Sequence, residues 1–523
     1  MKNHFLFIII VVVFSINATA QQAGTLNMNF SQDGWDASMY GNNNGFYINK
    51  TLIQPDGKIL VCAEGYYPSE ATQAVVVRYN TDGSVDTTFG GGDGVVRSKD
   101  DAAIDLWTHA NGMGIQNTGK IIIAGDAFGT EERIFRLNAD GSLDASFGIN
   151  GVINRPRPNA EFIYHVGIQS DNKIIICGEE SRLVNGTLEP HVFLWRFTEN
   201  GTLDTSFGNT GVVSYTSTAW LNAVGARFVL NDLIILLDDK ILINQSFTKA
   251  PNGSVMLRKF NANGSSDSSF GTDGEAIKNV VANQADYKYS SSAVQQNGSI
   301  ISSITSKDET NNIYTESIYR VNAQGAIDSS FNINLRNPTN FPETLQLKVS
   351  EDKVYIIKKS DQSGYSFDEI LCYDLSGNLV TSFGNNGVLL LNQNNIPQSY
   401  PNKAAISLDG TINLVSNITD PNNSANTLFL AVSVMGFNPN LSNSDNLAAS
   451  NAIVYPNPTT GIVSISKSDY TIIEKVEIVD SLGKVLNIIT ENTAQIDLST
   501  YASGIYVLKI YSGERMFQKK IIR

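Results

Sequence analysis

The chain of 523 residues is poor in cysteine, in basic residues and in charge overall, and each shortage excludes a class of protein. Its three cysteines, Cys62, Cys177 and Cys372, are too few for the disulfide framework of a small secreted domain. Lysine and arginine total 37 against 51 aspartate and glutamate, and the net charge of −14 argues against a nucleic-acid partner. With 17% charged residues and 42 glycines, the composition favours short strands and turns over helices.

Catalytic and metal-binding patterns are missing as well. The histidines beyond the first twenty residues, His109, His165 and His191, lack metal-ligand spacing. No HExxH, CxxC, GxSxG, phosphate-loop or dinucleotide-binding pattern occurs. We therefore name no catalytic residue and no metal site, expect no cofactor, and lean towards a protein that is not an enzyme. Calcium is the one ion considered, for the Asx-rich turns at residues 80–83 and 138–141, although turn stabilisation explains these turns better.

Long apolar runs are restricted to the N-terminus. Residues 5–14 form an apolar run that follows Lys2 and precedes Ala18-Thr19-Ala20, the small-x-small pattern that signal peptidase cleaves. The run is shorter than the roughly 18 residues that span a bilayer as a helix. Residues 1–20 are therefore predicted to be a signal peptide, and the remaining chain is predicted to be exported without a transmembrane segment.

What the sequence has in abundance is an internal repeat. The motif G-x-L-D-x-S/T-F-G-x-x-G-V occurs in three strong copies, from Gly83, Gly141 and Gly201. Weaker copies start at Gly24, Gly264, Gly325 and Gly377. Each copy carries a phenylalanine, and these anchors are 52 to 63 residues apart: Phe30, Phe89, Phe147, Phe207, Phe270, Phe331 and Phe383. Units repeated at this period indicate the blades of a propeller or the turns of a solenoid.

A turn dipeptide lies midway between successive motifs. Its second residue is always Gly, Asn or Asp, the types that tolerate positive φ in a tight hairpin. The dipeptides are Asp56-Gly57, Thr118-Gly119, Asp171-Asn172, Asp238-Asp239, Asn297-Gly298, Glu351-Asp352 and Asp409-Gly410. Each unit is therefore predicted to hold four strands: one after the motif, one on either side of the hairpin, and one before the next motif.

The two ends of the repeat region distinguish a ring from an open stack. The last unit ends with the strand at residues 428–437 and has no motif after it, while the N-terminal motif at residues 24–35 has no unit before it. A ring can complete its last blade with N-terminal residues, whereas a solenoid needs a polar cap at each end. We predict an all-β fold: a seven-bladed β-propeller of four-stranded blades at residues 21–437, closed by the N-terminal segment. Six or eight blades remain alternatives.

Two charged positions change together among the units. A basic residue lies five residues before the motif glycine and an aspartate three residues after it: Arg78 with Asp86, Arg136 with Asp144, Arg196 with Asp204, Lys259 with Asp267, and Arg320 with Asp328. Where Cys372 or Gly436 replaces the basic residue, Val380 or Asn27 replaces the aspartate. We predict structural salt bridges in five blades. The alternative is that each aspartate only caps its own turn.

The repeat resembles a known family at this point. Its GxLDxSFG motif and its QxDGKI hairpin, seen at residues 54–59, resemble the delta-sixty repeat, a family of bacterial propeller-type repeats. The resemblance covers roughly residues 24–440, and the sixth unit departs from it at Cys372 and Val380. It implies a propeller fold and says little about activity.

The C-terminal part has a different character. Residues 438–452 are small and polar, as expected of a linker. Residues 453–523 contain YPNPTTG, SLGKVL, LSTYASGIYVLKI and a basic end at Lys519-Lys520, and they resemble the C-terminal sorting domain of type IX secretion substrates in Bacteroidota. The resemblance implies a small Ig-like β-sandwich, the type IX secretion machinery as partner, and a location outside the cell or on the outer-membrane surface.

The expected ligand site lies on the loops that face away from the hairpins and motifs. These loops differ in every unit, and variable loops on a rigid frame are where binding usually resides. The candidate ligand-binding residues are aromatic or basic: Tyr66, Tyr67, Phe128, Arg155, Arg157, Trp220, Tyr287, Phe341, Tyr365 and Tyr400. Any one of these rings can instead pack between blades.

Three functions are compatible with these features. We favour a non-catalytic binding or interaction propeller whose ligand is a glycan or a protein, because aromatic rings beside polar groups suit both. The alternatives are a secreted polysaccharide hydrolase or lyase that uses acids at the central channel, and a structural surface component.

Overall fold

The computed structural model describes residues 22–38, 45–67, 72–100, 109–127, 131–156, 160–184, 187–216, 227–248, 254–279, 290–308, 313–337, 344–350, 352–362, 365–391, 403–407, 410–420, 423–437, 452–455, 459, 461–467, 473, 475–480, 485–490, 493, 495–502, 504–512 and 515–523. These residues form strands β1–β35 and one 3-10 helix, η1 (Ser98–Asp100). The all-β prediction is confirmed.

The described residues as far as Phe437 form seven antiparallel sheets of four strands, numbered here in chain order. The first holds β2 (Gly45–Ile53), β3 (Ile59–Tyr66), β4 (Gln73–Tyr79) and β5 (Val95–Arg97), and the second β6 (Gly112–Ile115), β7 (Ile121–Ala127), β8 (Glu131–Leu137) and β9 (Val152–Pro156). The third holds β10 (Ala160–Ile168), β11 (Ile174–Val184), β12 (Thr187–Phe197) and β13 (Val212–Tyr215), and the fourth β14 (Arg227–Ile235), β15 (Ile241–Thr248), β16 (Ser254–Phe260) and β17 (Glu275–Asn279). The fifth holds β18 (Ser292–Val294), β19 (Ile300–Asp308), β20 (Ile313–Val321) and β21 (Ile327–Asn337), and the sixth β22 (Thr344–Val349), β23 (Lys353–Gln362), β24 (Tyr365–Asp374) and β25 (Val388–Leu390). The seventh holds β26 (Lys403–Ile406), β27 (Ile412–Asp420), β28 (Asn423–Val434) and β1 (Trp35–Ser38).

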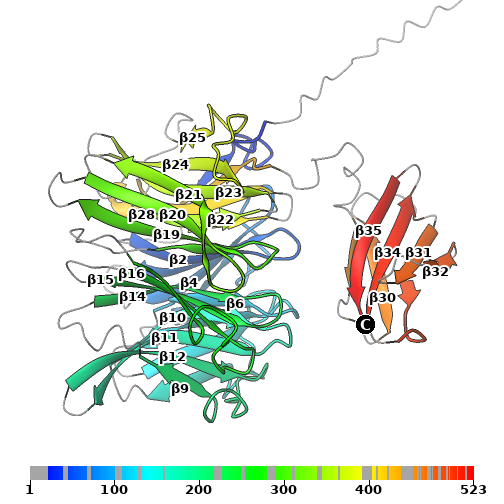
Figure 1. Ribbon diagram of the computed structural model, residues 1–523, viewed down its shortest axis with the longest axis horizontal. Coiled ribbons are helices and arrows are strands. Elements are labelled where there is room, and N and C mark those ends of the chain that lie inside the picture. The colour runs from blue at the N-terminus through cyan, green and yellow to red at the C-terminus, as the bar shows by residue number, and fades with distance from the viewer. Residues whose placement is uncertain are drawn as a thin grey trace, which may run out of the picture.

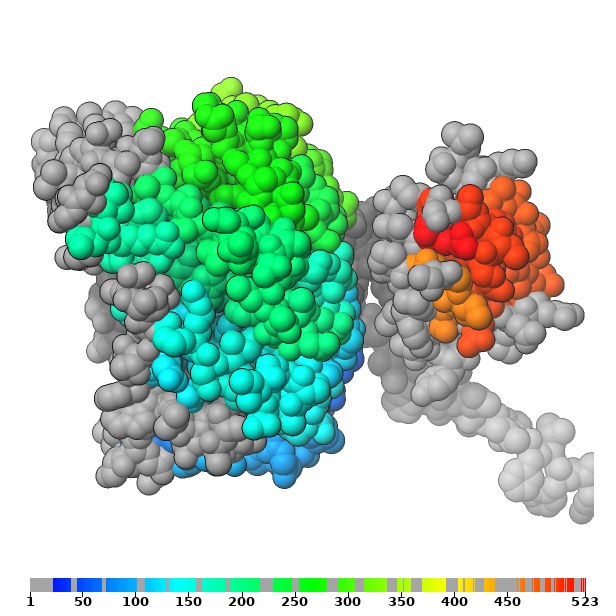
Figure 2. All heavy atoms as spheres, turned by 90° about the horizontal axis from the view of Figure 1, so that it is seen from below, coloured from blue at the N-terminus to red at the C-terminus, as the bar shows by residue number. Residues whose placement is uncertain are grey.

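Neighbouring sheets follow one another in a circle. The first strand of each sheet, here called its inner strand, contacts the inner strand of the next: β2 with β6, β6 with β10, β10 with β14, β18 with β22, β22 with β26, and β26 with β2 again. The backbone N–H of Ser292 joins the fourth and fifth sheets by donating to Asp232 over 2.8 Å. In Figures 1 and 2 the colour passes from blue through cyan to green from sheet to sheet, so sheets adjacent in sequence are adjacent in space. This arrangement is a β-propeller.

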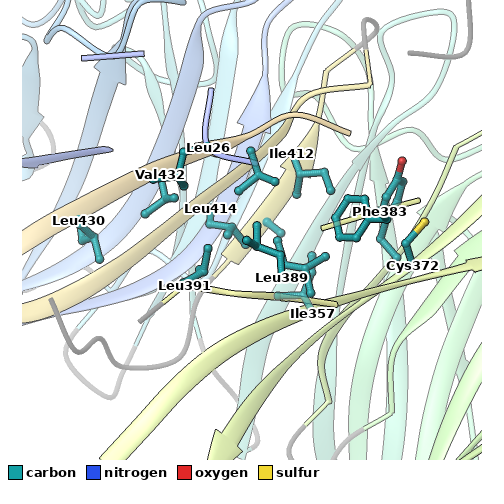
Figure 3. Close-up of a cluster of buried hydrophobic side chains, with 14 of the residues drawn as sticks. Leu26, Ile357, Cys372, Phe383, Leu389, Leu391, Ile412, Leu414, Leu430 and Val432 are labelled. Atoms are coloured by element: carbon teal, nitrogen blue, oxygen red, sulfur yellow. The ribbon is translucent and has the colours of Figure 1, made fainter. Parts of the chain in front are cut away.

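The N-terminal segment closes the circle as predicted. Strand β1 pairs antiparallel with β28, with Trp35 opposite Val432, and Leu26 forms a further bridge to Val434. Leu26 is buried in a hydrophobic cluster that joins the sixth and seventh sheets (Figure 3). The side chains of Leu414 and Val432 reach this cluster from the seventh sheet. Residues at opposite ends of the repeat region therefore share one core.

The sheets do not coincide with the sequence units. The strand after each motif joins the sheet of the two strands before that motif, so β5 pairs with β4 and β1 with β28. The motif is short enough to turn the chain back, as the bridge between Tyr79 and Val85 shows. One copy behaves differently: after Phe331 the Gly-x-x-Gly pair is missing, and β21 runs from Ile327 to Asn337 with residues 329–331 bulged out of its pairing with β20. All seven phenylalanine anchors are buried.

The hairpins follow the prediction in six units of the described chain. Positive φ occurs at Gly57, Gly119, Asn172, Asp239, Gly298 and Gly410. At the sixth sheet Glu351 lies outside the described residues, and Asp352 is not among the described residues with positive φ. There the turn is one residue shorter, because Ser350 N–H donates to the carbonyl of Lys353. For comparison, the usual turn is one residue longer, as in the first sheet, where Gln54 N–H donates to the carbonyl of Lys58.

The C-terminal residues form two further sheets. One contains β29 (Ala452–Tyr455), β30 (Ile462–Lys467) and β33 (Gln495–Asp497), and the other contains β32 (Val485–Ile489), β31 (Lys475–Asp480), β34 (Ile505–Ser512) and β35 (Arg515–Ile522). Residues of both sheets, among them Val463, Ile496 and Leu508, are buried in one cluster. This domain therefore has a core of its own. Strand β29 begins at Ala452, one residue inside the predicted linker.

Candidate functional site

Each sheet has two ends, which we call the motif side and the loop side. The motif side carries the tight hairpins, such as Gln54–Lys58, and the motif loops, such as Gly83–Gly94. The loop side carries the opposite strand ends, including those of β3 and β7. Because the strands are antiparallel, alternate connections lie on alternate sides.

Arg136 shows how the motif side is held together. Its guanidinium is buried, and Nε donates to Asp144 Oδ2 over 2.7 Å. Nη1 donates to the carbonyl of Glu199 in the next sheet over 2.5 Å. The guanidinium carbon also lies 4.8 Å from the ring centroid of Phe147. One side chain thus joins its own strand, its own motif loop and the neighbouring sheet.

The structure places all five predicted acid–base pairs within ion-pair distance. The nitrogen–oxygen separations are 2.6 Å for Arg78–Asp86, 2.7 Å for Arg136–Asp144, 2.9 Å for Arg196–Asp204, 3.5 Å for Lys259–Asp267 and 2.6 Å for Arg320–Asp328. The five cations also donate to carbonyls of the next sheet: Ala139, Glu199, Ala262, Ala323 and Leu375. No sequence pattern indicates these second bonds, because their acceptors are backbone atoms.

The turn-capping alternative holds at the same time. Asp144 Oδ1 accepts from the backbone N–H and hydroxyl of Ser146, while Oδ2 accepts from Lys120 as well as from Arg136. Burial acts to raise the pKa of Asp144, but these hydrogen bonds outweigh it and hold the pKa well below its usual range. Both carboxylate oxygens are therefore fully used for structure.

Two neighbouring interfaces lack the arginine and are joined by other bonds. At Cys372 of the sixth sheet, the hydroxyl of Tyr355 accepts from the N–H of Phe437 over 2.9 Å. At Gly436 of the seventh sheet, Ser31 N–H donates to the carbonyl of Asp82 over 2.6 Å, a backbone bond that also occurs beside Arg136, from Gly148 to Asn200. Both interfaces flank the seventh sheet, which the N-terminal segment completes.

The three cysteines are structural. Cys62, Cys177 and Cys372 are buried and form no disulfide. Burial raises the pKa of each thiol well above its usual value, so no reactive thiolate is available at neutral pH.

The loop side holds a different set of polar groups. Glu64, at the end of β3, accepts a hydrogen bond from the hydroxyl of Tyr66 over 3.2 Å, and its Oε2 lies 3.0 Å from Nδ1 of His109. Asn49 donates to the other oxygen of Glu64 and to the carbonyl of Ala110 in the second sheet. Glu64 is buried, whereas Tyr66 is 42% exposed. The Tyr66 side chain therefore reaches the surface while its hydroxyl is bonded to a buried carboxylate.

The next two sheets carry acids at the position of Glu64. Asn111 donates to Asp126 and to the carbonyl of Ile163 in the third sheet. Glu179 accepts from the backbone N–H of Leu230 over 2.8 Å, and burial raises its pKa to about 7. The loop side of the first three sheets is thus lined by an arc of carboxylates.

The sequence-predicted ligand residues divide into three groups. Tyr66 lies at the surface of the Glu64 cluster just described. Tyr67 is buried against Phe46 in an edge-to-face contact, so its ring belongs to the core. Arg155 lies 3.6 Å above the ring of Trp195 and 3.7 Å from Glu132, so it packs between the second and third sheets. Tyr365 begins β24, and its side chain is not described. The remaining candidates lie outside the described residues: Phe128, Arg157, Trp220, Tyr287, Phe341 and Tyr400.

A central layer of residues, which sequence reasoning missed, lies on the inner strands. Each member lies four residues before the residue whose backbone N–H closes the hairpin of its sheet, as Lys50 lies four residues before Gln54. The seven members are Lys50, Gly112, His165, Asp232, Ser291, Gln346 and Lys403. In four sheets the member directly follows a bulge, as Lys50 and His165 do. Aligning the seven units on the hairpin would have revealed the layer. Of these seven residues one is a carboxylate, Asp232, and three others are lysines or a histidine.

Three members of the central layer accept a hydrogen bond from the next sheet, and a fourth, His165, has its Nε2 3.5 Å from the carbonyl of Leu230 in the next sheet. Asp232 accepts from the N–H of Ser292 over 2.8 Å, Ser291 accepts from Leu347 over 3.1 Å, and Gln346 accepts from Ala404. Lys50 and Lys403 have no lone pair to offer and cannot make this bond.

The turns considered for calcium use their own side chains. Asp82 accepts from the backbone N–H and the hydroxyl of Ser84, and Asp140 accepts likewise from Ser142. No group of three or more metal-ligating side chains was found among the residues that the structure describes. Within the same residues, no helix has the length and apolar character needed to cross a membrane.

Family models match both parts of the chain. Residues 453–523 match a secretion system C-terminal sorting domain. Residues 54–89, 116–147 and 169–207 match a β-propeller domain of unknown function, DUF5122. No curated protein matches the sequence.

Solved structures resemble the chain in fold only. A polysaccharide lyase of family PL25, an ulvan lyase, has a TM-score of 0.43 at 10% identity, covering 77% of this chain and 97% of the lyase. The endosialidase of phage phi92 has a TM-score of 0.35 at 11% identity, covering 94% of this chain and 87% of its own. The Nup133 β-propeller of Vanderwaltozyma polyspora has a TM-score of 0.38 at 9% identity, covering 76% and 97%.

Fold and family matches together define a β-propeller protein. More particularly, it is a propeller that carries a type IX secretion sorting domain at residues 453–523. That domain marks the protein for export to the cell surface or the extracellular space. The signal peptide at residues 1–20 and the delta-sixty assignment remain predictions.

Proposed function

We propose that this protein is a non-catalytic binding propeller, exported by type IX secretion, that takes a glycan or a protein on its loop side. Its ring would have seven blades, one for each four-stranded sheet of the described residues. The observation that carries the proposal is the contrast between the sides. Motif-side aspartates such as Asp144 have every oxygen engaged within the protein, whereas Tyr66 and His109 present polar groups to solvent.

The Glu64 cluster is suited to binding. Its buried carboxylate fixes the Tyr66 hydroxyl and the His109 ring, so both side chains lose little freedom when a ligand arrives. A tyrosine that offers both a ring face and a hydroxyl suits sugars and peptides alike.

A glycan array combined with a turnover assay tests the proposal. The chain without residues 1–20 should bind a subset of glycans or an exported protein and release no product from polysaccharides. Tyr66→Ala should abolish binding, while Arg320→Ala on the motif side should preserve it. Release of oligosaccharides from any polysaccharide by the wild-type chain would contradict the non-catalytic proposal.

A secreted polysaccharide hydrolase or lyase is the second candidate. One observation favours it: His109 and Tyr66 each lie within hydrogen-bonding distance of Glu64, an arrangement that can move protons. If this candidate holds, His109→Ala should abolish product release while leaving glycan binding within a few-fold of the wild type.

A further inference from the structure

Three lysines gather near the ring axis on consecutive inner strands. Lys50 lies on β2, Lys403 on β26 and Lys348 on β22, and β26 contacts both other strands. Lys50 and Lys403 belong to the central layer. Lys348 follows the layer residue Gln346 by two positions and therefore points to the same face of its strand. All three side chains are partly exposed, and none forms an ion pair with a described residue.

These charges converge on one region. Burial, and then the charge of Lys50, lowers the pKa of Lys348 to about 8, and the same two causes lower the pKa of Lys403. Asp232, on β14, is also within the electrostatic reach of all three lysines, although burial raises its pKa overall. Strands β2, β14, β22 and β26 belong to four different sheets around the ring. Strand β26 contacts both β2 and β22, and Lys50 and Lys403 share the central-layer position, so the three lysines lie on neighbouring strands around the axis.

A structural role does not account for the lysines. Other members of the layer accept a backbone N–H from the next sheet, as Ser291 and Gln346 do. An ammonium group cannot accept a hydrogen bond, so Lys50 and Lys403 do not make this contact, and neither forms an ion pair with a described residue. Like charges gathered at these partly exposed positions repel one another, and an anionic ligand would relieve that repulsion.

Exposed aromatic rings lie on the same inner strands, further towards the loop side. Tyr47 is 64% exposed and lies three residues before Lys50, and Phe162 is 44% exposed and lies three residues before His165. Exposed rings of this kind provide flat faces on which sugar rings pack. A ligand entering from the loop side would meet the rings first and the lysines next.

We propose that Lys50, Lys348 and Lys403 bind the carboxylate or sulfate groups of an acidic glycan whose sugar rings pack on Tyr47 and Phe162. The inference rests on the proposed function and names the ligand class of its site. The net charge of the chain is −14, so an acidic polymer is repelled at long range and these cations supply the local attraction.

Calorimetric binding of defined probes tests this proposal on the chain without residues 1–20. The probes are oligogalacturonate, its neutral methyl ester, dextran sulfate and neutral dextran, with free galacturonate and free sulfate to separate a glycan from a small anion. The test variant is the double substitution Lys50→Met/Lys403→Met. The control is Lys278→Met, which removes a lysine from the outer strand β17. Thermal melting without ligand shows that each variant folds, and the double variant should melt no lower than the wild type because it loses two repelling charges.

An acidic oligosaccharide should bind the wild type and the control, and should bind the double variant about thirtyfold more weakly or worse. The neutral sugars should bind much more weakly than the acidic ones. Acidic and neutral oligosaccharides binding equally, with no loss in the double variant, would overturn this inference and leave the proposed function standing. Binding of the free anions as tightly as the oligosaccharides would overturn the assignment to a glycan. No binding of any probe or array glycan to the wild type would overturn this inference and would leave only a protein as ligand for the proposed function.

Discussion

The acids of the motif side and those nearer the loop side have opposite environments. Asp144 receives hydrogen bonds from Arg136, Lys120 and Ser146, and its pKa is lowered. Glu316, on β20, is buried with no hydrogen bond to either oxygen, and burial raises its pKa to about 8. Glu179 also has a raised pKa, of about 7. Satisfied acids maintain a fold, whereas under-satisfied ones cost stability and are usually retained for another reason.

The same contrast separates the cations. Arg136 bonds to its own sheet and to the next, and each of the other four pairs repeats this pattern. Lys50 and Lys403 have no such partner. The residues of the repeated motif thus hold the sheets of the ring together. Residues outside the motif are the ones that can recognise a ligand. The following predictions test whether the motif side maintains the fold while the loop side recognises the ligand.

The largest effect is expected from opening the ring. A chain that starts at residue 39 loses β1 and Leu26, and exposes the cluster around Leu414 and Val432. The loss should exceed the roughly 5 kcal/mol at the upper end of a single core truncation, because several buried side chains lose contacts together. Circular dichroism on heating should show a much lower or absent transition. A chain that melts like the full protein would contradict this prediction, because the contacts of β1 and Leu26 would then contribute little to stability.

Arg136→Ala should have the next largest effect. Its guanidinium is 1% exposed, and removing it leaves buried acceptors unpaired, which costs about 3 kcal/mol. Urea unfolding measures the change. Arg320→Ala is the matched control: its ion pair with Asp328 is the most exposed of the five, at 18% and 30%, so the loss should be much smaller.

A double-mutant cycle separates the pair from its surroundings. Arg136→Ala and Asp144→Ala should cost less together than the sum of the single losses, because each alone leaves a partner unpaired. Strict additivity would mean that the ion pair itself contributes nothing, and that the next-sheet carbonyl of Glu199 and the ring of Phe147 account for the role of Arg136.

A smaller, pH-dependent effect is expected at Glu316. Its folded pKa of about 8 exceeds the unfolded value near ~4.3, so the folded state holds the proton more tightly and its contribution to stability falls as pH rises between these values. Glu316→Gln should therefore melt at about the same temperature as the wild type at pH 4 and increasingly higher towards pH 9.

Glu131→Gln serves as the control for that titration. Its side chain is 45% exposed, so the melting difference from the wild type should not grow with pH. A constant difference at Glu316 would mean that this carboxyl is ionised in the folded protein and has a partner.

The opposite pH dependence is expected of the motif side. Hydrogen bonds from Ser269 and Lys240 overcome burial and lower the pKa of Asp267 to about 2. The stability that this ion pair adds is present above the unfolded value near ~3.9 and is lost as pH falls towards 2. Lys240→Met should weaken this loss, which melting curves between pH 2 and 5 would detect.

The frame was predictable because the repeat encodes it locally. The motif at Gly24 without a unit before it, and the missing motif after Phe437, led to ring closure, and β1 pairs with β28 accordingly. The basic residue and the aspartate are replaced together at Cys372 and Val380, and this joint replacement predicted the five ion pairs. The bond from Arg136 to Glu199 could not be foreseen, because backbone acceptors leave no trace in composition.

The candidate site was much less predictable. Tyr66 and Tyr67 are adjacent, yet one ring is 42% exposed and the other 8%, and the sequence does not say which side each faces. Lys50 and Lys403 lie far apart in the chain, and each looks like a single polar residue in its own unit. Only the ring brings them near the same axis, and only alignment on the hairpins shows that they occupy the same position.

Measuring stability and binding in parallel on one variant from each side tests the division most directly. The loop-side variant is Tyr66→Ala/His109→Ala, the motif-side variant is Arg320→Ala, and each is melted and then applied to a glycan array. We predict that the loop-side variant still unfolds in one cooperative transition and loses binding, whereas the motif-side variant melts lower than the wild type and still binds. A loop-side variant that binds normally, or a motif-side variant that folds normally but does not bind, would contradict the account.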